Sequence, residues 1–288
     1  PLGQTDFGAL GIKSVSHAFI SDAELQVLQC PGDYGCSQYC EVDINCQEGS
    51  DWQKLKRTVL RIKTSTQYCS GVLLNNTAYD GKPYGLTVEH CIKTQSTASL
   101  ATFYFNYESP SCNGGDGSID SRTVGSFLRD AGDSIDFSLV ELYNKPPDEY
   151  NAYYAGWNLG HGHTPVYTTI HHPMGDVKKV SMDNDNISIP QSQSDVKASV
   201  LWDYHFFSFW RIHEWDLGST EAGSSGSNPR KRADCLPWTK AIAVSPRSAN
   251  TYIFIWVCMR YSLTPVTRRK RMRADIIKYA ERAVRSRR

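Results

Sequence analysis

The sequence contains no apolar run of about eighteen residues, the length needed for an ordinary membrane-spanning helix, so we expect no membrane span. It also contains no internal repeat, and its formal net charge is only +1 over 288 residues. No signal peptide is visible at Pro1, and we expect one to have been removed or to lie upstream of this sequence.

Cysteine, in contrast, is abundant. The chain has nine cysteines, and seven of them fall between Cys30 and Cys112. So many cysteines in so short a stretch are unusual for a cytosolic protein and indicate an oxidising compartment, which predicts a secreted or extracellular protein. The spacing alone does not decide which cysteines pair.

The small net charge hides a strong asymmetry. Residues 228–288 contain sixteen Lys or Arg and three Asp or Glu, a balance of about +13, so the rest of the chain carries about −12. Residues 273–285 place apolar side chains at helical spacing between basic ones, which predicts a basic helix for nucleic acid or anionic lipid. The alternative is a shifted reading frame after Ser227, and the sharp boundary at that point favours it.

Short β-prone runs fill the middle of the chain, divided by clusters of Gly, Asn, Asp and Ser. A first set comprises residues 58–62, 71–74, 84–88, 101–107 and 137–142, and a second set comprises 165–170, 179–182 and 205–212. They predict an all-β fold of two antiparallel β-barrels, the first over about 50–145 and a second, incomplete one from about 150. Residues 10–19 alternate like a further strand, and residues 113–117 indicate a surface loop.

Three motifs carry the chemistry. His90 closes the segment Leu-Thr-Val-Glu-His, Asp136 precedes an apolar run, and Ser225 lies in the glycine-rich segment 218–227. Histidine, aspartate and serine in this chain order match a chymotrypsin-type triad. A serine hydroxyl needs a base to take its proton, histidine titrates near neutral pH, and a buried carboxylate orients the imidazole. Each motif alone also fits a loop, a structural histidine or a strand start, but the ordered set favours catalysis.

Several segments, in order, resemble the bacterial lysyl endopeptidases, which are secreted trypsin-like serine proteases. They are residues 40–46, 71–77, 81–84, 105–107, 154–157, 170–173 and 216–221. The resemblance spans roughly residues 37–227 and implies a trypsin-like double barrel in that region. Residues 1–36 are similar to the end of the propeptide region of such proteins, and residues 228–288 form a divergent tail.

The resemblance also implies disulfide bonds. Cys69 would pair with Cys91 and pin the histidine loop, and Cys46 would pair with Cys112. Cys40 would reach a cysteine beyond the nucleophile, for which Cys235 and Cys258 are the candidates.

The chain departs from the family in three ways. Glu89 stands before the histidine, where the family usually has a small residue. Asn228 follows Ser227, where the family has a proline. Beyond Ser225 only Asp234, Asp275 and Glu281 are acidic, and none lies in a recognisable pocket motif, so no specificity residue is assigned.

The sequence also offers a weak metal pattern in His161, His163, His171 and His172. No cysteine or carboxylate stands at helical ligand spacing near them, so we expect no metal.

The sequence therefore predicts a secreted serine endopeptidase that acts on protein or peptide substrates, with a preference for lysine in view of the family. Ser225 would attack the carbonyl, His90 would transfer the proton, Asp136 would orient His90, and the backbone N–H groups of Gly223 and Ser225 would form the oxyanion hole. We expect no cofactor, no nucleic-acid partner and a monomer. Two alternatives stay open, namely a protease-like chain with impaired catalysis and a binding protein that uses the basic tail.

Overall fold

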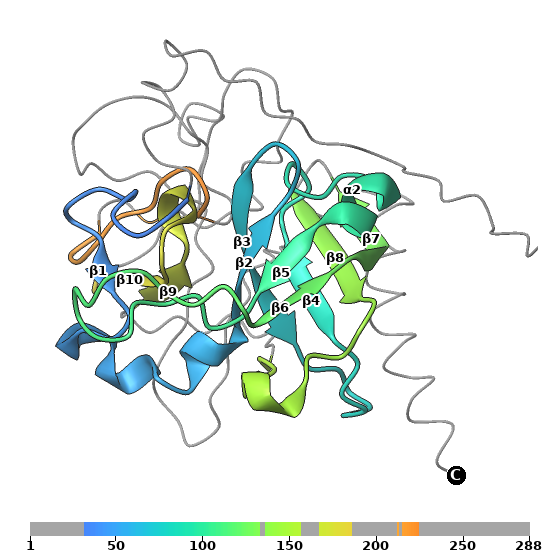
Figure 1. The fold of residues 1–288 in the computed structure, drawn as a ribbon, viewed down its shortest axis with the longest axis horizontal. Helices are drawn as coiled ribbons and strands as arrows, with labels where there is room; N and C mark the ends of the chain where they lie inside the picture. Colours follow the sequence, from blue (N-terminus) through green and yellow to red (C-terminus); the bar gives the residue numbers. More distant parts are fainter. Residues whose placement is uncertain (1–31, 133–135, 157–166, 186–211, 213–214, 225–288) are drawn as a thin grey trace, which may run out of the picture.

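The computed structural model describes residues 32–132, 136–156, 167–185, 212 and 215–224. In this part the chain consists mainly of β-strands (Figure 1). The strands are β1 (Val42–Asp43), β2 (Val59–Lys63), β3 (Tyr68–Leu74), β4 (Tyr84–Thr87), β5 (Thr102–Tyr104), β6 (Arg122–Val124), β7 (Ser126–Gly132), β8 (Phe137–Leu142), β9 (Tyr167–His171) and β10 (Lys179–Asp183). The helices are α2 (Gln95–Leu100) and the 3₁₀ helices η1 (Gln47–Trp52), η2 (Leu55–Thr58), η3 (Asp148–Tyr150) and η4 (Pro173–Gly175).

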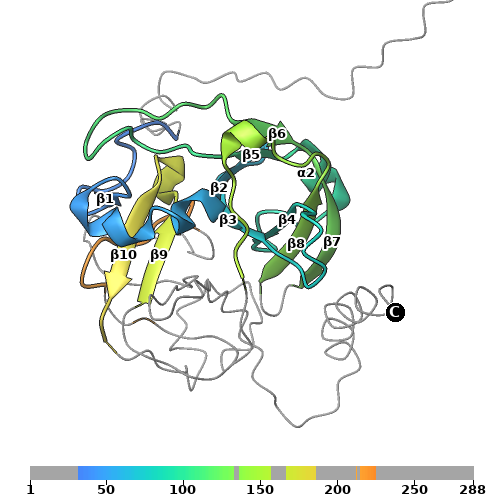
Figure 2. The same cartoon turned by 90° about the horizontal axis from the view of Figure 1, so that it is seen from below.

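Seven strands form one antiparallel sheet in the order β6-β5-β2-β3-β4-β8-β7. The sheet curls round on itself, as Figure 2 shows from below. Five of its strands confirm the runs predicted for the first barrel. The sequence did not predict β6 and β7, because β7 is rich in polar and small residues and carries a register shift between Leu128 and Asp130.

Three strands form a second sheet in the order β1-β10-β9. Strands β9 and β10 confirm the predicted runs at 165–170 and 179–182, and Leu217 adds an antiparallel bridge to Met182 of β10. The predicted strand at 205–212 lies outside the described residues except for Ile212. The predicted strand at 10–19 and the whole basic tail from 228 onward also lie outside them.

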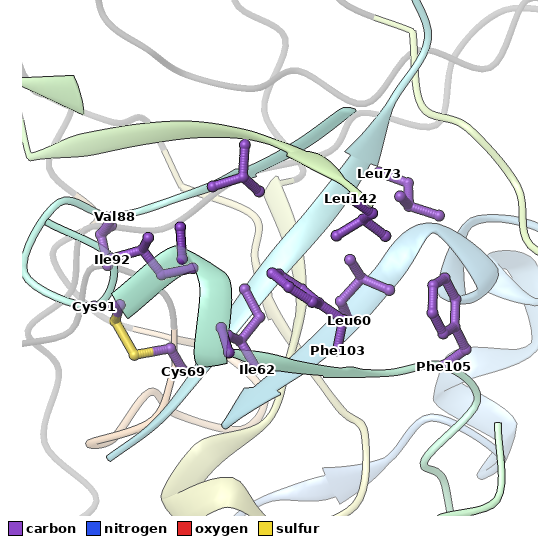
Figure 3. Packing of buried hydrophobic residues seen from close by; sticks show 13 residues of the cluster. Leu60, Ile62, Cys69, Leu73, Val88, Cys91, Ile92, Phe103, Phe105 and Leu142 are labelled. Carbon is purple, nitrogen blue, oxygen red and sulfur yellow. A yellow bond between two sulfur atoms is a disulfide. The ribbon is translucent and has the colours of Figure 1, made fainter. Parts of the chain in front are cut away.

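Strands β2 and β3 of the first sheet are buried on both faces. In β2 and β3 successive side chains alternate between two apolar clusters, as the two-residue period of a strand requires. Leu60, Ile62 and Leu73 pack inside the curled sheet (Figure 3), whereas Val59 and Val72 pack toward the second sheet. The second cluster also contains Ile44, Trp52, Ile170 and Val180, so it joins the two sheets.

The segment before β1 packs against the second sheet. The buried Asp176 carboxylate accepts hydrogen bonds from the backbone N–H groups of Gly35 and Ser37 and, at 2.6 Å, from the Ser37 hydroxyl. The few described residues at the end of the predicted 1–36 segment are therefore held in place by Asp176. Residues 113–117 form the predicted loop, mostly exposed. Within the described part, no helix has both the length and the hydropathy needed to cross a bilayer.

Candidate active site

Strand pairing brings His90 and Asp136 together. His90 lies three residues beyond the end of β4, and Asp136 immediately precedes β8. The two strands are antiparallel, with Thr87 opposite Ser138, so the end of β4 lies beside the start of β8. The two residues that the sequence predicts as base and orienting carboxylate therefore meet where β4 ends and β8 begins.

The two side chains form a direct pair. Nδ1 of His90 lies 3.0 Å from Oδ1 and 2.9 Å from Oδ2 of Asp136, and the backbone N–H of His90 donates to Oδ1 at 3.1 Å. An ionised carboxylate only accepts, so Nδ1 carries the ring proton and Nε2 of the neutral ring keeps a lone pair. The Asp136 side chain is 1% exposed and that of His90 is 23% exposed. The ring is thus oriented from the protein side while part of it faces solvent.

Asp136 occupies the left-handed region of backbone space, with φ 51°. Such conformations cost energy for residues other than glycine and tend to gather at functional sites. Here the backbone turn aims the carboxylate at His90 just before β8 begins.

A disulfide bond fixes the histidine loop. Cys69 of β3 is bonded to Cys91, the residue after His90, and both are buried in the first apolar cluster (Figure 3). Cys46 is bonded to Cys112. Both predicted pairs are confirmed. Cys40 is disulfide-bonded as well, to a partner outside the described residues, and Cys36 is a free thiol.

Glu89, the departure from the family before His90, is buried and forms an ion pair with Lys93 at 3.1 Å. Its charge is therefore balanced within the same loop. Among the described residues, Glu89 makes no hydrogen bond to the His90 ring.

The glycine-rich loop is described up to Ser224, so Ser225 itself lies outside the described residues. Gly223 has φ +90°, and a Cβ there would lie 2.8 Å from both the backbone nitrogen of Gly175 and the carbonyl oxygen of His172. Only glycine fits this position, because a side chain would be strained and would collide with backbone. The loop packs directly on η4, where the N–H of Met174 donates to the carbonyl of Ala222.

Below this loop runs a chain of hydrogen bonds through a buried histidine. Nδ1 of His171 lies 2.7 Å from the Ser224 hydroxyl and Nε2 lies 3.0 Å from the Ser181 hydroxyl. Ser181 donates to the Ser219 carbonyl at 2.6 Å, so its oxygen accepts from Nε2–H and leaves Nδ1 to accept from Ser224. Burial, reinforced by the Lys179 charge, lowers the pKa of His171 to about 3. His171 is therefore neutral and holds Ser224 to β9, while Ser181 of β10 holds Ser219 at the start of the loop.

A carboxyl pair lies beside the same loop. Burial raises the pKa of Glu41 well above its ordinary value, and the neighbouring Glu221 carboxylate raises it further. Burial also raises the pKa of Glu221, which accepts from the Gln38 N–H at 2.9 Å. Glu41 Oε2 is 3.8 Å from Nε2 of His171. The raised pKa of Glu41 favours its protonated form, which avoids a second negative charge beside Glu221.

The histidines weighed as metal ligands have other partners where they are described. His171 binds two serines, and Nδ1 of the buried His172 lies 2.9 Å from the Asp176 carbonyl oxygen. Burial lowers the pKa of His172 well below its ordinary value. His161 and His163 lie outside the described residues, among which no group of His, Cys, Asp or Glu has the arrangement of a metal site.

Sequence reasoning missed the polar residues that support the loops, chiefly Ser70, His171 and Glu41. The available signal was the pair His171-His172 before a proline, but the sequence analysis explained this pair by the family resemblance alone. Their partners are set by contacts between segments far apart in the chain, such as residues 171 and 224, which a local pattern does not contain.

Comparison with known proteins adds the following. The family model of the lysyl endopeptidase C-terminal domain matches residues 34–231. A lysyl endopeptidase of Pseudomonas aeruginosa is 29% identical over 214 residues, which cover 67% of this chain and 42% of that protein. The chain thus spans less than half the length of this relative.

Similarities to solved structures are more distant. The protease Anisep from Arthrobacter nicotinovorans is 13% identical with a TM-score of 0.43, over 68% of this chain and 80% of that one. The MamO protease domain from Magnetospirillum magneticum is 8% identical with a TM-score of 0.30, over 46% and 61%. The family match covers well over half of the sequence and ends close to the point where the basic tail begins. In the described residues the fold is mainly β, and the chain belongs to the lysyl endopeptidase C-terminal domain family.

Proposed function

We propose that this protein is a serine endopeptidase that hydrolyses peptide bonds through an acyl-enzyme, with His90, Asp136 and Ser225 as its triad. The observation that carries the proposal is the pairing of His90 Nδ1 with the buried Asp136 carboxylate at 2.9 Å. This contact leaves Nε2 as the basic nitrogen of the ring.

The mechanism follows from these roles. The Ser225 hydroxyl attacks the substrate carbonyl while Nε2 of His90 takes its proton, and the protonated ring then gives that proton to the leaving amine as the C–N bond breaks. Water enters by the reverse sequence, with His90 again as base, and the acid product leaves. Asp136 stabilises the imidazolium that forms in each half, and it costs little reorganisation because it is already aimed at the ring.

The backbone N–H groups of Gly223 and Ser225 are the proposed oxyanion hole. In the described residues the Gly223 N–H has no hydrogen-bond acceptor, whereas the Gly223 carbonyl accepts a hydrogen bond from the Ser70 hydroxyl. The φ of +90° at Gly223 supports a tight turn at this position, which the proposed oxyanion hole requires.

We also propose that the protein is secreted, acts as a monomer and prefers to cleave after lysine. The two disulfides support an oxidising compartment, and the preference rests on the name of the Pseudomonas aeruginosa relative. No cofactor takes part in the proposed reaction.

A second candidate function is that of a protease-like chain with impaired catalysis, because the family match ends at residue 231. A protease-like chain with a misbuilt specificity pocket would keep the triad and lose most turnover, since positioning is worth roughly 7–11 kcal/mol in well-oriented reactions. A binding role for the basic tail would need no catalysis.

One experiment separates these functions. The purified chain is treated with a fluorophosphonate probe and the labelled residue is mapped by mass spectrometry, with Ser225→Ala as control. We expect a single label at Ser225, lost in Ser225→Ala, with hydrolysis of lysyl peptide substrates lowered by about 10⁴ to 10⁶ in the variant. Labelling without turnover supports the impaired protease. Folded protein that takes no label contradicts the proposed triad.

A further inference from the structure

Ser70 lies where the two halves of the site meet. It belongs to β3, one residue after the disulfide-bonded Cys69, and is 1% exposed. It plays no part in the proton transfers described above. Its side chain and its backbone nevertheless contact the loops that carry each half of the proposed site.

The protons of this contact can be assigned. The backbone N–H of His172 donates to the Ser70 oxygen at 2.9 Å, because an N–H cannot accept. Ser70 Oγ lies 2.9 Å from the Gly223 carbonyl oxygen, which can only accept, so the hydroxyl proton points at Gly223. The Ser70 hydroxyl thus both accepts and donates, and its single proton is committed to the nucleophile loop.

This bond acts on the peptide next to the proposed oxyanion donor. The Gly223 carbonyl is held toward β3 by Ser70, and the N–H of the same peptide, that of Ser224, donates to the Glu221 carbonyl at 3.0 Å. Both polar ends of the 223–224 peptide are therefore fixed. Since glycine at φ +90° has few steric limits of its own, the hydrogen bonds decide the orientation of its backbone.

The backbone of Ser70 contacts the histidine side. Its carbonyl accepts from the Thr87 hydroxyl at 2.8 Å, and Thr87 is the last residue of β4, three before His90. The preceding Cys69 is bonded to Cys91, the residue after His90. One residue of β3 thus connects the strand that presents the base with the loop that presents the oxyanion donors.

We propose that Ser70 is a positioning residue that sets the oxyanion loop at Gly223 relative to His90. This inference rests on the proposed serine-protease function and deepens it. Without the hydroxyl, the Gly223 carbonyl and the His172 N–H lose their shared partner, and the 223–224 peptide is free to rotate. Loss of one oxyanion donor costs about 10²–10³ in kcat, and an indirect misplacement is expected to cost less, about 10- to 100-fold.

The test compares two buried serines in the full chain. Ser70→Ala removes the proposed positioning hydroxyl. Ser109→Ala is the matched control, because the buried Ser109 hydroxyl also donates to a carbonyl, that of Ser111, and accepts from a backbone N–H, that of Gly114. Melting temperature and the rate of fluorophosphonate labelling at Ser225 are measured for the unmodified chain and both variants. Lysyl peptide hydrolysis separates kcat from KM.

We expect both variants to lose similar stability, and only Ser70→Ala to label about 10- to 100-fold more slowly per folded molecule, with a fall in kcat and KM within about threefold. A positioning role also predicts weaker binding of a peptide aldehyde ending in lysine, because its adduct places an oxyanion in the hole. Equal labelling rates for Ser70→Ala and Ser109→Ala overturn the role of Ser70 while leaving the triad intact. An unmodified chain that does not label overturns the serine-protease function and this inference with it.

Discussion

The Ser224 hydroxyl donates to Nδ1 of the buried His171 across 2.7 Å, which places a neutral histidine directly beneath the loop that leads to Ser225. The other ring nitrogen is held by Ser181, so the ring is fixed at both ends. A protonated His171 would lose its acceptor at Nδ1 and would be a buried charge beside Lys179. The geometry of the loop therefore depends on His171 staying neutral.

This dependence predicts a pH effect on stability. The pKa of His171 falls from 6.5 in the unfolded chain to about 3 in the folded chain. As the pH is lowered, the His171 ring is therefore protonated in the unfolded chain before it is protonated in the folded one. The stability that the neutral ring contributes is present above pH 6.5 and is lost as the pH falls toward 3. His171→Asn should reduce the slope of unfolding free energy against pH in this window, whatever its effect at neutral pH. Urea unfolding from pH 7 to 4 measures the slope, and an unchanged slope would show that His171 is not the group concerned.

Asp136→Asn should lower kcat strongly while the fold persists. The amide can donate a hydrogen bond to Nδ1 and so favours the tautomer in which Nε2 carries the proton and cannot act as base. In well-studied serine proteases this exchange costs about 10⁴ in kcat. Hydrolysis of a lysyl peptide measures the loss. Asp120→Asn, on an exposed loop where the carboxylate accepts from Ser118, is the control and should keep the parent rate.

The two disulfides should separate stability from activity. Cys46 and Cys112 are 66 residues apart and Cys69 and Cys91 are 22 apart, so in the chain-entropy model the first bond restricts the unfolded chain more.

Paired Cys→Ser variants should each lose about 2–5 kcal/mol, with the larger loss for the first. The labelling rate of the folded fraction at Ser225 should fall mainly in the second, because its bond adjoins His90. The opposite ranking of labelling rates would argue against a role for Cys69–Cys91 in holding the base.

The basic tail should limit turnover. The family match ends at residue 231, and residues 228–288 carry a charge balance of about +13. Replacing the sequence after Ser227 by that of a regular family member is expected to raise cleavage after lysine by orders of magnitude, since a complete pocket wall would hold the substrate side chain. A chain that already cleaves lysyl substrates at about 10 per second, typical of enzymes, would show that its own tail builds a working pocket.

Local patterns account for much of the fold. Runs of β-prone residues bounded by Gly, Asn, Asp and Ser clusters predicted strands β2 to β5 and β8 to β10, since both signals lie within a short window of sequence. The edge strand β7 was not predicted, because its residues are less buried and a bulge interrupts the alternation of side chains between the two faces. Helix α2 was not predicted either, although its N-cap residue Thr94 accepts a hydrogen bond from the Thr97 N–H at 3.2 Å.

In the candidate site, too, some features follow from the sequence and others from the tertiary structure. The sequence by itself determined the residue types, their order and the glycine at 223, because nucleophile chemistry and a left-handed turn each demand particular side chains. Only the tertiary structure decided that His90 and Asp136 meet, through the pairing of β4 with β8, and that Ser70 and His171 support the loop before Ser225. A buried polar group takes whichever partner the packing of distant segments places within about 3 Å, and that choice is made by the whole fold rather than by neighbouring residues.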